Sequence, residues 1–543
     1  MTTNEKKMTR RKFIGTTVKA GVGLTAGVSL IGLSKGPSAM AATKEGLASG
    51  MIGGPTGFEG CERYQYGPDS AAGRAIEGLK KLKAAGKTPK KFVMMCAPGS
   101  VGHWEAAFPE GARKVKEVFA EETGIEIEIV DIVATEQFTK IIQDHQTRAR
   151  SYDIYSFWSS ELPDLVASGS LHQLDEFMDK YKPDWLDPEF GLPGGEITLA
   201  ATSQVLGKTY NVLFDGDWQS WCYRRDLFED PQEQQAFKDK YGWDLQWPET
   251  WEQLDQVADF FHRPDKGLLG CTDLRNQHWG FTNWYQRYTS MANPYQTYFD
   301  ENTGKPLIDS DAGIKAATEH VETLRYHHKD GITWGWPEQY QNMAAGGTAI
   351  TCAFPNMPKF LDNPGNKDSK IVGKLRSGIT PGRIIDGVLV RRSVWWPSIG
   401  HGVPTSGKYA EAAYLVLQWG SSGHISTWMT GNPGGYYDPW RLPHFKDPLV
   451  VSSYKPYHMP TLVESIEMSS PPIFIPGVKQ YQTALDTNLQ EAMTKRKTPA
   501  QAMQDCAKAW EKITDRRGRE KTIEAIKASR AAWPTKVYKP VIS

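Results

Sequence analysis

The stretch Phe119-Ala-Glu-Glu-Thr-Gly-Ile-Glu-Ile-Glu-Ile129 joins the end of a predicted helix to the start of a predicted strand. Val115, Val118 and Phe119 recur at helical spacing, and Gly124 is the residue type that commonly ends a helix. From position 125 to 129 isoleucine alternates with glutamate, which predicts a half-buried strand. This helix-to-strand junction is typical of an α/β protein.

The flanking residues extend this junction into a β-α-β-α-β unit. An apolar strand is predicted at 92–96, a helix at 136–149 and a third strand at 152–157. This order implies a parallel sheet with right-handed crossovers. In such sheets ligands bind outside the carboxyl ends of the strands. The loops at 98–104 and 157–161 are therefore the first places to look for a site.

The N-terminus has the features of an export signal. Thr9-Arg10-Arg11-Lys12-Phe13 precedes a mild apolar stretch at 22–33, and small residues up to Ala41 suit cleavage there. The paired arginines favour the twin-arginine route to the periplasm over an uncleaved anchor. The stretch is too short and glycine-rich to span a membrane, and the absence of a cysteine at the cleavage point argues against a lipid anchor.

The formal net charge of zero hides an asymmetry. Residues 1–41 carry seven Lys or Arg and one Glu, which leaves 56 basic against 62 acidic residues in the mature chain. A net charge near −6 argues against nucleic acid or an anionic membrane as partner. Beyond the signal we find no apolar run of the ~18 residues that a membrane helix needs. We expect a soluble monomer.

Length and cysteine usage limit the possibilities further. About 500 mature residues exceed one ordinary core, so we expect two or more lobes that can enclose a ligand. The cysteines are scattered without a C-x-x-C pair, which disfavours a zinc or redox centre. Disulfides and buried free thiols are equally good accounts of them. The cysteines are Cys61, Cys96, Cys222, Cys271, Cys352 and Cys506.

An ordered set of segments gives the chain a family resemblance. Residues 119–127, 152–154 and 165–174 resemble the extracellular solute-binding proteins of ABC importers, in the maltose-binding class. Later segments continue the resemblance in the same order, so that it covers residues 91 to about 518. These segments are 221–228, 241–254, 344–351, 410–419, 497–503 and 509–510.

The resemblance implies two α/β lobes with a ligand enclosed between them and hinge closure as the signal to the importer. Crossover strands would lie near 210–223, 348–355 and 398–404. The N-terminal lobe would hold 91–215 and 348–400, and the C-terminal lobe 216–347 and 401–543. Two segments exceed the expected pattern: an N-terminal extension at 42–90, with a helix near 71–85, and an insertion-like stretch at 431–470.

Aromatic residues are the main candidates for ligand contact. The chain holds 19 Trp and 22 Tyr, several of them in predicted loops. Flat aromatic faces suit a pyranose ring and also a quaternary ammonium. Trp158 with Glu161 ranks first, since the pair stands where the maltose-binding class carries a pocket Trp followed by an acid. Alternatively, Trp158 only covers the end of the sheet and Glu161 begins a helix.

The other candidates are weaker. Glu136 fits a ligand-binding acid and a helix N-terminal acid equally well. At most one of two adjacent strand tryptophans can face a ligand, and a lone arginine is more often in a surface salt bridge. Besides Glu136, the candidates are Asp217 and Trp218 on the first crossover, Trp279 and Trp284 in the second lobe, Phe354, Asn356, Trp395 and Trp396 beside the other crossovers, and Tyr436, Tyr437 and Arg441 in a glycine-rich loop.

The sequence contains none of the common catalytic motifs, such as G-x-S-x-G, H-E-x-x-H or a P-loop. His327 and His328 are adjacent and do not share a helix face, so they do not predict a metal site. We expect no catalytic residue, metal or cofactor. The sequence favours a periplasmic receptor that delivers a sugar or polyol to an ABC permease. The alternatives are an exported periplasmic enzyme for a small polar substrate and a binding protein for a cationic or aromatic solute.

Overall fold

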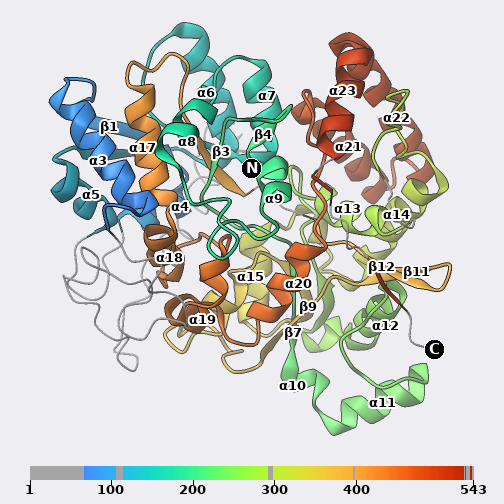
Figure 1. Cartoon of the computed structure of the whole chain (residues 1–543). Helices are drawn as coiled ribbons and strands as arrows, with labels where there is room; N and C mark the ends of the chain where they lie inside the picture. The colour runs from blue at the N-terminus through green and yellow to red at the C-terminus, as the bar shows by residue number, and fades with distance from the viewer. Residues whose placement is uncertain are drawn as a thin grey trace, which may run out of the picture.

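The computed structural model describes residues 67–105, 114–291, 297–394, 398–530 and 532–533, together with the backbone of 538–540 (Figure 1). The predicted signal at 1–41, residues 42–66 of the extension, and Trp395 and Trp396 lie outside the described residues. In the part of the chain that is described, no helix is both long and apolar enough to cross a membrane.

The first packed body is built on a mixed sheet that contains the predicted β-α-β-α-β unit. Strand β1 (Lys91–Cys96) pairs in parallel with β2 (Glu126–Asp131), and a parallel bridge from Met94 to Ile154 places β3 (Tyr155–Trp158) on its other side. Strand β13 (Ile399–Gly402) then pairs antiparallel with β3 and with β6 (Val212–Leu213). The predicted order of elements and the parallel pairing are confirmed.

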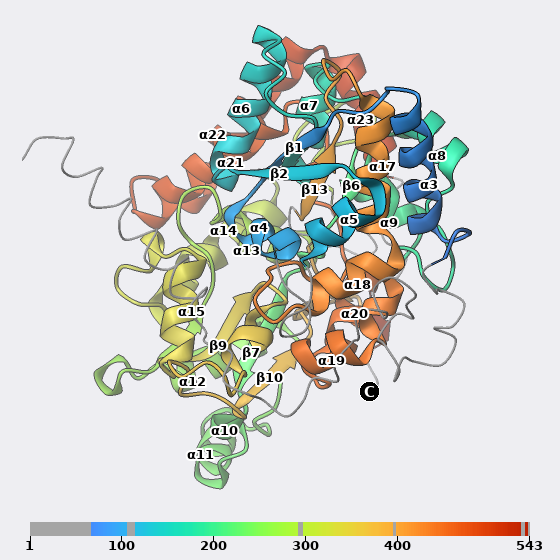
Figure 2. The ribbon, with the colours of Figure 1, turned by 90° about the vertical axis from the view of Figure 1, so that its left-hand side faces the viewer.

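Helices cover both sides of this sheet (Figure 2). Helix α5 ends as predicted at Gly124, whose φ of 64° is left-handed and whose N–H donates to the carbonyl of Ala120 at 2.7 Å. The helices of this body are α3 (Ala71–Ala84), α4 (Pro98–Glu105), α5 (Val115–Thr123), α6 (Ala134–Thr147), α7 (Leu162–Ala167), α8 (Asp175–Tyr181), α9 (Glu196–Thr202), α17 (Ala410–Ser421) and α18 (Gly423–Gly431).

The second body is a four-stranded sheet with helices packed on it. Its strand order is β10 (Leu375–Gly378), β7 (Ser220–Arg224), β9 (Thr348–Ala353) and β8 (Leu269–Thr272), with β8 and β9 parallel. Its helices are α10 (Arg225–Phe228), α11 (Pro231–Tyr241), α12 (Trp251–Phe261), α15 (Trp336–Ala344) and α16 (Met357–Leu361). Asp230 and Thr250 cap α11 and α12, because their side chains accept hydrogen bonds from N–H groups of the first helical turn.

A bundle of helices continues this body on one side and has its own apolar core. It consists of α13 (Phe281–Thr289), α14 (Asp311–Glu322), α21 (Val478–Met493), α22 (Pro499–Arg517) and α23 (Arg519–Arg530). Beside it lies a small antiparallel sheet of β11 (Gly382–Ile385), β12 (Val388–Arg391) and β14 (Tyr538–Pro540).

Short connections cross between the two sheets. The chain leaves β6 of the first sheet and enters β7 of the second within the predicted crossover at 210–223. After β12 of the small antiparallel sheet, the chain re-enters the first sheet as β13, which lies within the predicted crossover at 398–404. The two-lobed α/β architecture with crossover strands is thus present.

Two segments depart from the expected lobe assignment. Strands β9 and β10, expected in the N-terminal lobe, pair within the second sheet. Residues 401–431, expected in the second lobe, belong to the first body, whereas 478–530 lie in the helical bundle as expected. Helix α17 packs against α3 in the same apolar core as β1 and β2, because its buried face is lined by Ala412, Leu415 and Trp419. The segment at 431–470, which holds α19 (Pro448–Tyr454) and α20 (Met459–Glu467), contacts α18 of the first body and α16 and β7 of the second. The chain therefore passes between the bodies more often than the sequence indicated.

Candidate ligand site

Three aromatic rings from separate elements meet where the two bodies join. The ring of Trp158, at the end of β3, lies edge-on at 4.9 Å from that of Trp279, which precedes α13. Trp279 in turn lies 5.8 Å from Phe354, which follows β9. All three side chains are partly exposed. We call these three residues the aromatic platform; the sequence predicted each of them.

Backbone pairing fixes the position of Trp158. It stands opposite Ile399 in the β3–β13 ladder, and the next residue, Ser159, donates its N–H to the carbonyl of Ser398 at 2.8 Å. Glu161, its predicted partner, is buried and accepts a hydrogen bond at 2.6 Å from Lys479 of α21. Burial raises the pKa of Glu161, against the opposing effect of Lys479. Its carboxylate thus faces the helical bundle as well as the end of β3.

The loop that carries Trp279 is held by α21. The N–H of His278 donates to the carboxylate of Asp486 at 2.8 Å, and the amide of Gln490 donates to the carbonyl of Arg275 at 2.6 Å. These bonds fix the backbone on both sides of the loop. Trp279 is therefore presented by a rigid support, although it lies outside regular structure.

A buried acidic group lies on the first crossover. Asp215 and Asp217, between β6 and β7, have carboxylate oxygens within 4.8 Å of each other and of Asp438 from the glycine-rich loop. We call these three residues the aspartate cluster. Burial is the first cause that raises the pKa of each, and for Asp217 the charges of the other two raise it further.

Polar side chains of the second body surround this cluster. Asn356 donates to Asp438 at 3.3 Å and to the carbonyl of Tyr436 at 3.3 Å, and it accepts from the hydroxyl of Tyr340 at 2.6 Å. The ammonium of Lys359 is buried, which lowers its pKa to about 7 against the opposing charges of Asp438 and Asp215. Three predicted residues, Asp217, Asn356 and Tyr436, therefore lie around Asp438. In the sequence, Asn356 is two positions after Phe354 of the aromatic platform.

Two predicted ligand residues of the glycine-rich loop have structural contacts instead. The ring of Tyr437 stacks on that of His103 at 3.6 Å, and its N–H donates to the same imidazole at 2.6 Å. Arg441 is fully buried, forms an ion pair with Asp184 at 2.9 Å, and donates to the carbonyls of Phe190 and Ser421. We call residues 431–441 the brace loop, because it is fastened to the first body by these contacts.

Two predicted tryptophans are core residues. Trp284 is fully buried in the helical bundle and stacks on Tyr288 at 4.6 Å. Trp218 is 1% exposed and packs in the core of the first body. Aromatic residues near a crossover are thus divided between core and surface, and a loop position in the sequence does not distinguish the two.

Glu136 lies apart from the other candidates. It is exposed in the first turn of α6, where a carboxylate is favoured by the helix dipole. Trp395 and Trp396 fall on residues outside the described part of the chain.

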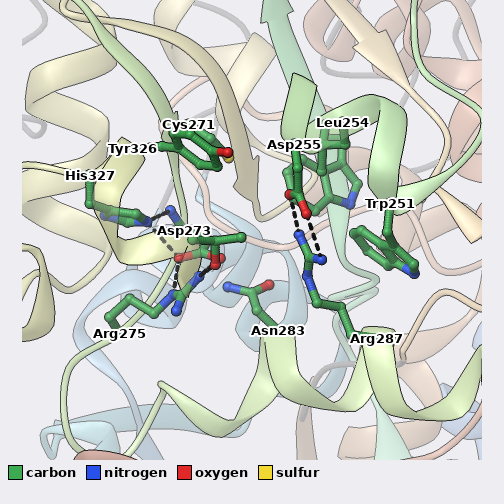
Figure 3. Close-up of a pocket in the computed structure, with 12 residues that line it drawn as sticks. Trp251, Leu254, Asp255, Cys271, Asp273, Arg275, Asn283, Arg287, Tyr326 and His327 are labelled. Carbon is green, nitrogen blue, oxygen red and sulfur yellow. Dashed lines mark hydrogen bonds and ion pairs between the residues drawn. The ribbon is translucent and has the colours of Figure 1, made fainter. Parts of the chain in front are cut away.

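A small pocket of the second body is lined by an ion-pair network, shown in Figure 3. Arg275 and His327 both contact Asp273, and Arg287 forms an ion pair with Asp255 at 2.6 Å. The enclosed space is about 10 Å³, which holds at most one water molecule. The pocket has no room for a solute. Its ion pairs instead hold together α12, α13 and the end of β8.

Several residues of the acidic region were not predicted from the sequence, namely Asp215, Asp438, Lys359, Tyr340 and Tyr454. The Asp215-Gly-Asp217 pair was the one available signal for them. Asp438 lies more than 200 residues further on, so only the fold brings it to the pair. The cysteines at 96, 222, 271, 352 and 506 are buried free thiols.

Comparison with known proteins agrees with this architecture. The solved structure of an ABC transporter solute-binding protein of Agrobacterium radiobacter in complex with ribitol is similar, with a TM-score of 0.64 and 18% identity over 78% of this chain and 98% of that one. A protein of Agrobacterium vitis with bound D-mannitol gives a TM-score of 0.62 and 19% identity over 79% and 99% of the two chains.

Sequence comparison gives the family. A curated relative in Sinorhizobium fredii, described as a probable amino-acid ABC transporter periplasmic-binding protein, is 25% identical over 77% of this chain and 89% of its own. The model of the family described as bacterial extracellular solute-binding protein matches residues 102–422. The chain belongs to the bacterial extracellular solute-binding protein family.

Proposed function

We propose that this solute-binding protein captures a sugar or polyol on the aromatic platform and delivers it to the permease of an ABC importer. The observation that carries the proposal is the meeting of three partly exposed rings, Trp158, Trp279 and Phe354, contributed by both bodies. Such rings stack on the apolar face of a carbohydrate, while neighbouring polar groups bind its hydroxyls.

The same contacts suggest how solute binding is signalled. The Trp158–Trp279 contact and the Glu161–Lys479 ion pair both join the first body to the helical bundle. A solute that contacts both sides favours the closed arrangement, because it binds that state better than an open one. We propose hinge closure about the crossovers as the event that the permease recognises.

The relatives favour transport over catalysis, since the family and the similar structures are binding proteins. Because one relative is described as a probable amino-acid binding protein, any solute screen should also include amino acids. We further propose a periplasmic monomer, exported by the twin-arginine route and cleaved near Ala41. Replacement of Arg10 and Arg11 by lysine should then leave the precursor in the cytoplasm.

A thermal-shift screen of the mature protein tests the solute class. Ribitol, D-mannitol, maltose, amino acids and quaternary amines are added singly, and each hit is followed by calorimetry. A true ligand at ~100 times its Kd stabilises the protein by about 2.7 kcal/mol. We expect hits among sugars and polyols, with the solute recovered unchanged. Hits confined to amino acids or amines, or conversion of the solute to a product, would contradict the proposal.

A further inference from the structure

We propose that Asp215, Asp217 and Asp438 bind a divalent metal cation of the calcium type, which ties the first crossover to the brace loop. The three carboxylates each offer an oxygen, and these oxygens lie within 4.8 Å of one another. An ion with Ca²⁺–oxygen distances of 2.3–2.6 Å fits among oxygens at that spacing. None of the three rings of the aromatic platform belongs to the cluster, so we expect the same metal binding whichever solute the protein carries.

The region holds three buried carboxyl groups whose ionised forms a bound cation would stabilise. Asp215, Asp217 and Asp438 are 2%, 9% and 0% exposed. Lys359 is the nearby cation, but its ammonium donates to the carbonyls of Thr430 and Gly435 at 3.1 and 2.7 Å and is a single charge against three. Buried carboxylates without compensation are strongly unfavourable.

An unsatisfied oxygen provides a second, independent observation. Asp438 uses Oδ2 to accept from Asn356, whereas its Oδ1 is fully buried and has no hydrogen-bond partner. Asp215 is held in place by the N–H groups of Gly216 and Asp438, which donate to its Oδ1 at 2.9 and 2.6 Å. The cluster thus combines a fixed carboxylate with a buried oxygen that lacks the ligand such atoms require.

The donor atoms determine the class of metal. The cluster offers carboxylate oxygens, with an amide and tyrosine hydroxyls beside them and no thiolate or imidazole among its three members. Hard oxygen donors suit Ca²⁺, Mg²⁺ or Mn²⁺, whereas Zn²⁺ and Cu²⁺ prefer nitrogen and sulfur. Each of the three carboxylates offers one oxygen in this arrangement. The adaptable shell of Ca²⁺ suits such a buried site better than the regular octahedral shell of Mg²⁺, which usually keeps several waters.

Calcium titration of the chelator-treated, dialysed mature protein tests the inference. We expect about one Ca²⁺ per chain by calorimetry, and a rise in Tm of roughly 5 °C at saturation. Tb³⁺ in place of Ca²⁺ should luminesce on excitation of tryptophan, because Trp218 follows Asp217 in the chain. Failure of Ca²⁺, Mg²⁺ and Mn²⁺ to bind at millimolar concentrations would overturn the proposal.

Matched variants locate the site. Asp438→Asn and Asp217→Asn should each weaken Ca²⁺ binding at least tenfold, and Asp144→Asn, a buried acid of α6 bonded to Tyr155, should leave it unchanged. In EDTA, Asp438→Asn should unfold at a Tm no lower than the wild type, since it removes one of the crowded charges. A cooperative unfolding transition at that Tm also shows that the variant is folded.

Two outcomes would assign the cluster differently. If Ca²⁺ binds equally well to wild type, Asp217→Asn and Asp438→Asn, the metal is held elsewhere. Suppose that ethanolamine raises the Tm of the wild type but not of Asp438→Asn, and that Ca²⁺ raises the Tm of neither protein. The cluster then holds the ammonium of a solute, and the metal proposal is wrong.

Discussion

The aromatic platform and the brace loop look alike in the sequence and differ in the structure. Both place aromatic residues in loops beside polar or charged ones. Trp158, Trp279 and Phe354 remain partly exposed between two bodies, whereas Tyr437 and Arg441 are buried against the first body. An aromatic or charged loop residue is available to a ligand only when its side chain is not already packed on, or hydrogen-bonded to, the rest of the protein. The platform should therefore control affinity, and the brace loop should control stability.

The largest expected effect is on the brace loop. Arg441→Ala should lower the free energy of unfolding by about 3–5 kcal/mol, because it leaves Asp184 and the carbonyls of Phe190 and Ser421 without their donor. Urea denaturation measures the loss. Calorimetry on the folded protein at low temperature should give a solute affinity close to that of the wild type. A stable Arg441→Ala protein with weakened solute binding would move Arg441 to the ligand site.

A buried histidine at the start of α20 should make the protein acid-sensitive. The imidazole of His458 contacts the hydroxyl of Ser377 at 2.6 Å and the carbonyl of Pro355 at 2.9 Å, and burial lowers its pKa to about 4. The unfolded chain takes up this proton near pH 6.5 and the native protein does not. Stability is therefore lost as the pH falls from 6.5 to 4, by up to about 3 kcal/mol for this residue.

Denaturation curves between pH 7 and 4.5 check this dependence. His458→Gln should flatten the curve, and His328→Gln, at a partly exposed position, should leave it as in the wild type. An unchanged slope in His458→Gln would show that this histidine is not responsible for the acid sensitivity.

The smallest effect on stability, and the most specific one on binding, is expected at the platform. Trp158→Ala should weaken solute binding about 30-fold, equivalent to about 2 kcal/mol for a stacking residue, with little change in Tm. Trp334→Ala is the matched control, since Trp334 is also partly exposed but stacks on His328 at 4.9 Å. Equal affinities for Trp158→Ala and the wild type would exclude the platform as the site.

Sequence reasoning found the architecture more completely than the site. Alternation at 125–129 and the glycine at 124 decide a strand and a helix end by local physics, and both are present in the fold. The burial of Trp284 and the assignment of α17 depend on which helix packs against which, a long-range property. Asp438 is likewise uninformative in sequence, because only tertiary packing brings it to Asp217.

A crystal structure of the mature protein with ribitol or D-mannitol tests the central claim most directly. We expect the solute to lie within about 4–4.5 Å of the rings of Trp158, Trp279 and Phe354, in contact with both bodies. A solute bound elsewhere, with these three rings packed on one another as before, would contradict the account.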